Sequence, residues 1–263
     1  MSRNLLLAAL CLGAATFSTS ACSQSNDRTP SSNADRPPVL DALEASGLTV
    51  VDEFPVGDGL RGFAGSAGQQ PIAVYITPGG DAIVGTRVDR AGNERDAQTL
   101  QKLVAGPMGE QAWSKLEAAE WIRDGRADAP RVIYTFSDPN CPYCNQLWQA
   151  ARPWVDAGKV QLRHVMVGVI REDSAGKAAT ILGAADPEAK LVENERNFAR
   201  GGVTPARTVP AGVRRTLDGN QMLMMQLGFR GTPAVVFRGA DGRVDRRSGM
   251  PQGPDLETVL GPR

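Results

Sequence analysis

The chain has 263 residues, of which 41% are hydrophobic, and its 29 basic side chains are balanced by 29 acidic ones. This length suits about two domains, and this apolar fraction is enough to fill their cores, which excludes a largely disordered chain. The formal net charge of zero gives no electrostatic basis for binding a polyanion. We therefore expect no nucleic-acid partner.

The first residues have the pattern of an export signal. Arg3 precedes an apolar run over residues 5–17, and small residues follow as far as Ala21, so we predict a signal peptide over residues 1–21. A buried helix or a membrane anchor is the alternative, although the run is too short to span a bilayer comfortably. Cys22 follows Thr19-Ser20-Ala21, an imperfect lipoprotein cleavage site, which makes a lipid anchor at Cys22 a further prediction.

Residues 22–38 are rich in Ser, Asn, Asp and Pro and predict a flexible tether. An N-terminal domain is then predicted over residues 39–95. It would comprise a helix followed by a small, mostly antiparallel sheet, with the helix at residues 39–46 and strands at residues 48–51, 72–76 and 82–88.

Residues 96–127 have helical spacing and predict a connector. The helical period includes Leu116 and Ile122, and we expect an interruption at Gly106-Pro107. Trp113 and Trp121 are interpreted as packing residues.

From residue 128 to 263 the pattern predicts a second domain. A strand, a helix and a strand are followed by a long helical tract, two short strands and a final helix, which is the order of a thioredoxin-like domain. The expected elements are residues 132–136, 141–156, 160–169, helices within 174–229, 234–238, 243–247 and 254–260. Met222, Met224 and Met225 are assigned to the core face of a helix in this tract rather than to an adaptable surface.

The second domain carries the motif Cys141-Pro142-Tyr143-Cys144 directly after its first strand. Proline suits the first position of a helix, so Cys141 is expected at the N-cap and Cys144 one turn into the helix. Free backbone N–H groups and the helix dipole stabilise a thiolate there and lower its pKa. Cys141 is thus predicted to be the nucleophile, and Cys144 its resolving partner.

Other interpretations of this cysteine pair are weaker. A zinc site needs four ligands, and beyond the pair the folded part offers only His164, so we expect no metal and no cofactor. A purely structural bridge across two residues would constrain the unfolded chain little. His164 itself lies in an apolar strand and is expected to be a core or surface residue.

Gly231-Thr232-Pro233-Ala234 ends the helical tract and opens a strand. In this fold context Pro233 is expected to be cis, with a trans proline at the strand start as the alternative. The bent backbone at Thr232 would leave edge groups free to pair with an extended substrate near Cys141.

These motifs closely resemble those of the periplasmic thiol:disulfide isomerases of the DsbC/DsbG family, and specifically of its DsbG branch. The resemblance is carried by residues 134–144, Trp148, residues 151–155 and residues 158–162. Trp113, Trp121 and the start of the domain at Asp128-Ala129-Pro130 fit the same branch. The likeness is strong over residues 96–170, returns at Thr232-Pro233 and is general elsewhere.

The resemblance implies an α+β protein that forms a V-shaped homodimer. Residues 39–95 would be a cystatin-like dimerisation domain, and residues 128–263 a thioredoxin-like catalytic domain with a helical insertion. The first cysteine would attack client disulfides, the second would resolve the adduct, and the Thr232–cis-Pro233 loop would oppose them. Pro142 and Tyr143 are assigned with that loop to substrate binding.

The same resemblance implies a periplasmic location, exported clients with disulfides or oxidised cysteines, chaperone-like binding, and reduction by a membrane thiol reductase of the DsbD type. The chain departs from related proteins at Thr135, where many thioredoxins have a buried acid, and it lacks a structural cysteine pair found in the DsbC branch. Alternative functions are a net dithiol oxidase, usually monomeric and without the first domain, and a holdase whose thiols are secondary. A glutaredoxin is excluded by length and by the export signal.

Overall fold

The computed structural model describes residues 36–262. The predicted signal peptide and Cys22 lie outside this range, as does nearly all of the predicted tether. Within it, no helix combines the length and apolar character that crossing a membrane requires.

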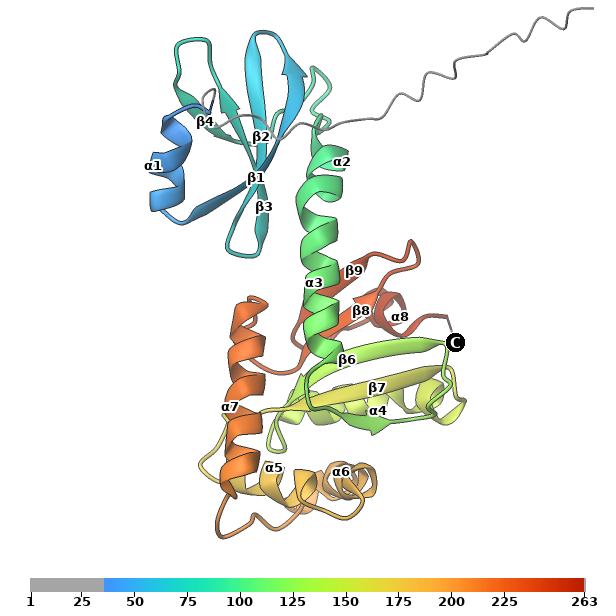
Figure 1. The fold of residues 1–263 in the computed structure, drawn as a ribbon. Helices are drawn as coiled ribbons and strands as arrows, with labels where there is room; N and C mark the ends of the chain where they lie inside the picture. Colours follow the sequence, from blue (N-terminus) through green and yellow to red (C-terminus); the bar gives the residue numbers. More distant parts are fainter. Residues whose placement is uncertain (1–35, 263) are drawn as a thin grey trace, which may run out of the picture. The chain divides into compact units, whose positions relative to one another are not determined.

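The first part of the described chain is an antiparallel sheet with a short helix, as predicted. Helix α1 (Val39–Ala45) precedes strands β1 (Leu48–Gly57), β2 (Leu60–Ala67), β3 (Gln70–Ile76) and β4 (Ala82–Gly85), and the strands pair in the order β1-β2-β3-β4 (Figure 1). Leu40 of α1 packs with Phe63, Val74 and Ile76 in a small core. Each strand of this sheet therefore pairs with the strand that follows it in the sequence.

Strand β2 is absent from the sequence prediction, and its glycines explain why. A Cβ atom on Gly62 would lie 2.1 Å from Cγ2 of Val56, and one on Gly65 would lie 2.4 Å from the carbonyl oxygen of Thr49. Glycine is thus required for close packing of β2 beside β1, yet glycine lowers the apparent strand propensity of a sequence.

The connector is helical from Ala97 to Glu117, as α2 (Ala97–Leu100), a π-helical turn (Gln101–Ala105) and α3 (Gly106–Glu117). The interruption expected at Gly106-Pro107 is therefore wrong. A proline ring would clash with the carbonyl four residues earlier in a regular α-helix, and the wider π turn directly before Pro107 relieves that constraint.

The second sheet begins earlier than predicted. Ile122, expected on the connector helix, lies instead in β5 (Ile122–Asp124). The other strands are β6 (Arg131–Ser137), β7 (Val160–Met166), β8 (Ala234–Arg238) and β9 (Val244–Ser248). Their spatial order is β5-β7-β6-β8-β9, with β6 and β7 parallel and the other pairs antiparallel, which matches the expected thioredoxin-like order.

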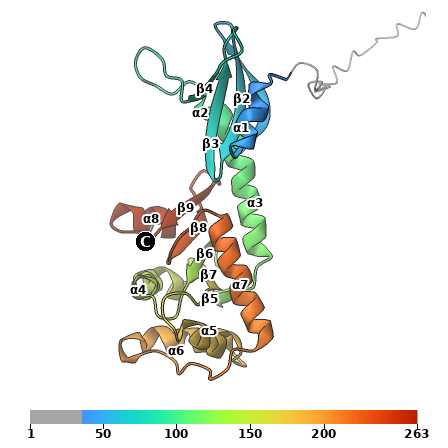
Figure 2. The ribbon, with the colours of Figure 1, turned by 90° about the vertical axis from the view of Figure 1, so that its left-hand side faces the viewer.

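Helices cover both faces of this sheet, and alternate residues of β6 face each side. Ile133 packs with Leu147 and Trp154 of α4 (Pro142–Asp156), whereas Tyr134 and Phe136 pack in another core with α3 and α7 (Ala211–Gln226). Figure 2 shows the sheet between α4 on one side and α3 with α7 on the other. The final helix α8 (Pro254–Leu260) joins the α4 side.

The predicted helical tract is an insertion between β7 and β8. It contains α5 (Ser174–Leu182), α6 (Pro187–Arg196), a 3-10 turn (Phe198–Arg200) and α7. Ile181 of α5 and Leu191 of α6 pack against Met166 at the end of β7, and α5 and α6 lie side by side in Figures 1 and 2. The insertion is thereby anchored where β7 leaves the sheet.

Candidate active site

Cys141 caps the N-terminus of α4. Its backbone is extended (φ −82°, ψ 113°), Pro142 is the first helical residue, and the backbone N–H of Cys144 donates to Sγ of Cys141 at 3.2 Å. Both cysteines are free thiols, 2% and 5% exposed, while Tyr143 between them is 55% exposed. The N-cap geometry expected from the Cys-Pro-Tyr-Cys spacing is thus present.

The two thiols have different acidities. A hydrogen bond with the Cys144 thiol contributes most to lowering the pKa of Cys141 to about 6. Polar groups of Thr232 and the backbone N–H groups of Tyr143 and Cys144 lower this pKa further, whereas burial acts in the opposite direction. Burial first, and then the neighbouring Cys141 sulfur, raises the pKa of Cys144 well above its ordinary value. At neutral pH the pair therefore holds one thiolate, on Cys141, and one proton, on Cys144.

The Thr232–Pro233 peptide is cis and lies against the cysteine pair. In its thiol form Cys141 donates from Sγ to the carbonyl oxygen of Thr232 at 3.3 Å. The Thr232 hydroxyl is buried and has no hydrogen-bond partner among residues 36–262. The structure therefore brings Thr232 into contact with the cysteine pair, although Cys141 and Thr232 are 91 positions apart in the sequence.

Asp138, three residues before Cys141, organises the turn that leads into α4, and the sequence analysis did not identify it. Its Oδ1 accepts from the backbone N–H of Asn140 and from the hydroxyl of Ser174, both at 2.8 Å. Its Oδ2 accepts from the backbone N–H groups of Val169 and Ile170 at 2.6 and 2.9 Å. This buried carboxylate ties the active-site turn to the segment that follows β7.

Asn140 makes a second link between that turn and the insertion. Its side-chain amide donates to Oδ1 of Asp173 at 2.8 Å, and its Oδ1 accepts from the buried ammonium of Lys177 at 2.6 Å. Lys177 also donates to the carbonyl oxygen of Gly201 at 2.8 Å. The residue preceding Cys141 is thus fixed by groups at the start of α5.

A buried charged cluster lies beside the other flank of α4. Arg152 of α4 donates to both carboxylate oxygens of Asp124 on β5, one of them at 3.0 Å, and Nε2 of His164 lies 3.5 Å from Asp124 Oδ2. Nδ1 of His164 is 3.1 Å from the Ser137 hydroxyl. Burial would raise the pKa of Asp124, but His164 and Arg152 outweigh it and lower that pKa to about 2. His164 is a core residue, as one of the expected alternatives held.

A buried carboxyl group contacts Asn145, the residue after Cys144, whereas position 135 holds a threonine in place of the acid found in many thioredoxins. Thr135 is buried, and its hydroxyl has no partner within the described chain. Glu195 of α6 accepts instead from the side-chain amide of Asn145, the residue after Cys144, at 2.8 Å. Burial raises the pKa of Glu195. Only the three-dimensional arrangement reveals this group, because Asn145 and Glu195 are 50 positions apart.

The methionine cluster is only partly a core feature. Met224 is buried with Tyr134 and Phe136, as expected, but Met222 and Met225 are 52% and 50% exposed. The prediction for these two side chains is therefore wrong, because they lie on a solvent-facing part of α7. Trp113 and Trp121 do pack as predicted, both edge-on to Tyr134.

Comparison with protein families shows the class of protein to which this chain belongs. The family described as thioredoxin-like domain matches residues 122–261, more than half of the chain, so this is a thioredoxin-like protein. Among solved structures, the catalytic domain of Proteus mirabilis ScsC is similar, with a TM-score of 0.46 and 23% identity over 57% of this chain and 95% of that one.

Closer relatives define the family. The chain is 44% identical over 228 residues to the thiol:disulfide interchange protein DsbG of Pseudomonas aeruginosa, covering 86% of this chain and 89% of that protein. It is 34% identical over 226 residues to DsbG of Escherichia coli, covering 86% and 91%. The chain belongs to the DsbG family of thiol:disulfide interchange proteins, and it is an enzyme of that class.

Proposed function

We propose that Cys141 is the nucleophile of a protein disulfide isomerase and reductase, and that Cys144 resolves its adducts. The observation that carries this proposal is the N-cap position of Cys141 on α4, where its Sγ accepts from the backbone N–H of Cys144, and the lowered pKa of Cys141 and raised pKa of buried Cys144 agree with it. A thiolate, not a thiol, attacks a disulfide. The Thr232 carbonyl beside Cys141 supports a role for the Thr232-Pro233 loop, with Tyr143, in holding the client.

The reaction follows from these positions. The Cys141 thiolate attacks one sulfur of a client disulfide, which forms a mixed disulfide and releases the other client sulfur as a thiolate. In isomerisation a client thiolate attacks the mixed disulfide, forms a new client bond and regenerates Cys141, with no net redox change. In reduction Cys144 loses its proton and attacks Cys141, releasing the client and leaving a Cys141–Cys144 disulfide.

Reduction transfers two electrons to the client, so the enzyme needs a reductant for each turnover. A membrane thiol reductase of the DsbD type is the proposed donor. Export by the signal at residues 1–21 would place the protein with such a partner in the periplasm, and anchoring through Cys22 is a separate proposal. Mass spectrometry of the mature N-terminus tests the anchor: an acylated Cys22 supports it, and a free Cys22 or a later start removes it.

Trapping tests the roles of the two thiols. Cys144→Ala leaves the attacking thiolate but prevents resolution, so DTT-sensitive adducts with client proteins should accumulate. Cys141→Ala should form none, although its fold is retained. Adducts that appear with Cys141→Ala but not with Cys144→Ala would reverse the assignment.

We also propose a homodimer formed through the first sheet. Strand β4 is an edge of that sheet, and its residues Ile83 and Val84 are 55% and 43% exposed. An edge strand presents unpaired backbone groups that can pair with another strand, and apolar side chains on it favour burial against a second copy. A twofold pairing of β4 with its counterpart satisfies both.

The other edge of the same sheet provides a matched control for this proposal. Val84→Arg should weaken dimerisation at least about tenfold, because it places like charges together at a twofold interface. Val51→Arg changes a residue on edge strand β1 that is 51% exposed and should leave the dimer intact. Analytical ultracentrifugation across a concentration series measures both, and a monomeric wild type would reject the proposal.

A further inference from the structure

We propose that a pocket next to the Thr232-Pro233 loop is a subsite for one large apolar side chain of the client, a few residues from the client cysteine under attack. This inference rests on the proposed function, because it concerns how the client is held during exchange. The pocket has a volume of about 590 Å³, and its lining includes Val169, Ile170, Met224, Met225, Phe229 and Gly231. Sites that bind small ligands have volumes of this order.

The pocket adjoins the loop that contacts Cys141. Gly231 lines it and immediately precedes Thr232, whose carbonyl oxygen is 3.3 Å from Sγ of Cys141. An extended chain advances about 3.3 Å per residue, so a client whose sulfur meets Cys141 and whose backbone follows the Thr232 loop has side chains within reach of the pocket.

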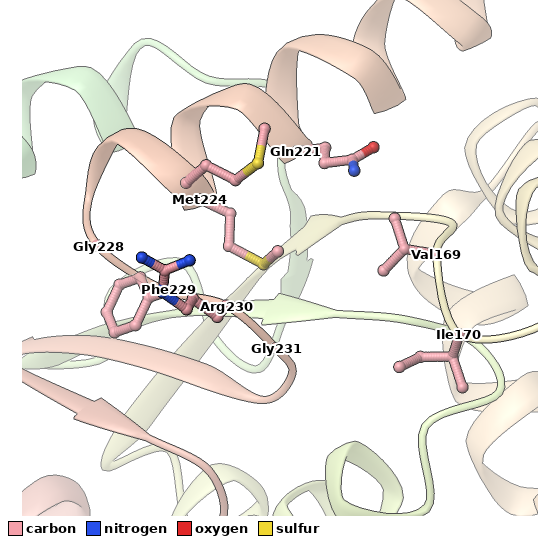
Figure 3. Close-up of a pocket in the computed structure, with 9 residues that line it drawn as sticks. Val169, Ile170, Gln221, Met224, Gly228, Phe229, Arg230 and Gly231 are labelled. Carbon is pink, nitrogen blue, oxygen red and sulfur yellow. The ribbon is translucent and has the colours of Figure 1, made fainter.

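Both walls of the pocket are held in place by the protein itself. One wall is the segment after β7, where the N–H groups of Val169 and Ile170 are bound by the buried carboxylate of Asp138. The other wall is α7, anchored through Met224 in the core of the second sheet. Figure 3 shows Val169 and Ile170 across the pocket from Gln221 and Met224. A preformed site of this kind binds without an ordering cost to the enzyme.

The exposed lining selects an apolar occupant. Val169, Ile170 and Met225 are 42%, 44% and 50% exposed, and a cluster of exposed apolar side chains is characteristic of a binding surface. The flexible, polarisable side chain of Met225 can adapt to occupants of different shape. Arg230 is the charged residue among the lining side chains and disfavours a basic occupant. The subsite therefore suits leucine, methionine or phenylalanine and rejects lysine.

A peptide series tests this specificity on the reduced full-length protein. Each peptide has one cysteine joined to glutathione by a disulfide, a glycine and serine background, and a single leucine placed from three residues before to three residues after the cysteine. Burial of a leucine side chain predicts a rate constant for reduction about tenfold higher at the favoured position. Lysine at that position should give no increase. Equal rates at all leucine positions would overturn the proposal.

Two methionines of α7 with similar exposure provide a test variant and a matched control. Met225 lines the pocket, whereas Met222 is one turn away on α7, is equally exposed and is not part of the lining. Met225→Glu should abolish the gain from leucine, and Met222→Glu should preserve it. Equal losses in the two variants would also overturn the subsite.

Reduction of glutathione disulfide separates the subsite from the catalytic proposal. This small substrate has no apolar side chain for the pocket, so the wild type and the Met222→Glu control should reduce it at the same rate. A wild-type protein that fails to reduce it would instead contradict the role of Cys141. An Ile170→Glu variant repeats the test from the opposite wall.

Discussion

The buried flank of the active-site helix is rich in charge, whereas the surface beside its N-terminus is rich in apolar side chains. Asp124 and His164 are buried beside α4, and Arg152 on that helix reaches the Asp124 carboxylate. Val169, Ile170 and Met225 are exposed and line the pocket that Gly231 borders, next to Thr232. The first arrangement joins α4 to β5 through the ion pair of Arg152 and Asp124, and the second keeps apolar surface available for a client. Charged side chains are usually exposed and apolar ones buried. The opposite arrangement here distinguishes the structural flank of the helix from its recognition surface.

Cys141 lies between the two regions, and its pKa gives the largest expected effect. A thiol with a folded-state pKa of about 6, against an ordinary 9.0, stabilises the folded dithiol protein fully above pH 9 and loses that contribution as the pH falls to 6. Three pH units correspond to at most about 4 kcal/mol. The raised pKa of Cys144 acts only above this window. Urea unfolding of the reduced protein at pH 6 and 9 measures the difference.

The comparison for that experiment is Cys141→Ser, which has no thiolate. Its free energy of unfolding should change much less between pH 6 and pH 9 than that of the wild type. An identical pH dependence in both proteins would show that other groups cause it. Alkylation of Cys141 by iodoacetamide should have its midpoint near pH 6 in the same samples.

Asp124→Asn is the next largest change, and it tests the charged flank. The side chains of Asp124 and Arg152 are 4% and 21% exposed, and removing one partner of a buried pair costs about 3 kcal/mol or more. The exposed pair of Arg126 and Asp128, whose side chains are 68% and 70% exposed, is the control. Asp128→Asn should leave the urea midpoint unchanged, and similar midpoints for both variants would mean that burial is irrelevant here.

Asp138→Asn tests the link between the active-site turn and the apolar region. Asparagine keeps only one of the two acceptor oxygens of aspartate and carries no charge. The variant therefore loses hydrogen bonds to a charged group, which should lower the free energy of unfolding by about 2 kcal/mol. Amide exchange at Val169 and Ile170 should accelerate, because these N–H groups bind Oδ2 of Asp138. Asp173→Asn removes a carboxylate that accepts from the Asn140 side chain and lies 3.4 Å from Nζ of Lys177, and neither contact involves the N–H groups of Val169 or Ile170. Exchange at Val169 and Ile170 should be unaffected in that control.

Features that depend on near neighbours could be predicted from the sequence. The N-cap position of Cys141 follows from Pro142 and from the spacing to Cys144, and the thioredoxin-like order follows from successive hydrophobic patterns. Strand β2 was missed because the glycines that permit its close packing, such as Gly62, weaken a strand pattern. A π-helical turn before Pro107 likewise has no clear sequence pattern.

Contacts between distant positions could not be predicted. Asp138 binds an N–H group 31 positions away, and Arg152 pairs with Asp124 across 28. An isolated aspartate in a sequence does not reveal whether its partner will be solvent, a backbone group or a guanidinium. The exposure of Met222 and Met225 could not be predicted either, because it depends on which side of α7 packs against the second sheet.

His164 has a practical consequence, because it is the one histidine in the whole sequence. Its imidazole is buried, between the Ser137 hydroxyl and the Asp124 carboxylate, in the sheet beneath the active-site helix. Every histidine resonance in an NMR spectrum of the untagged protein therefore belongs to this position, with no assignment required. A change in that signal upon oxidation of the cysteine pair or binding of a client would report directly on the sheet, provided that purification avoids a polyhistidine tag.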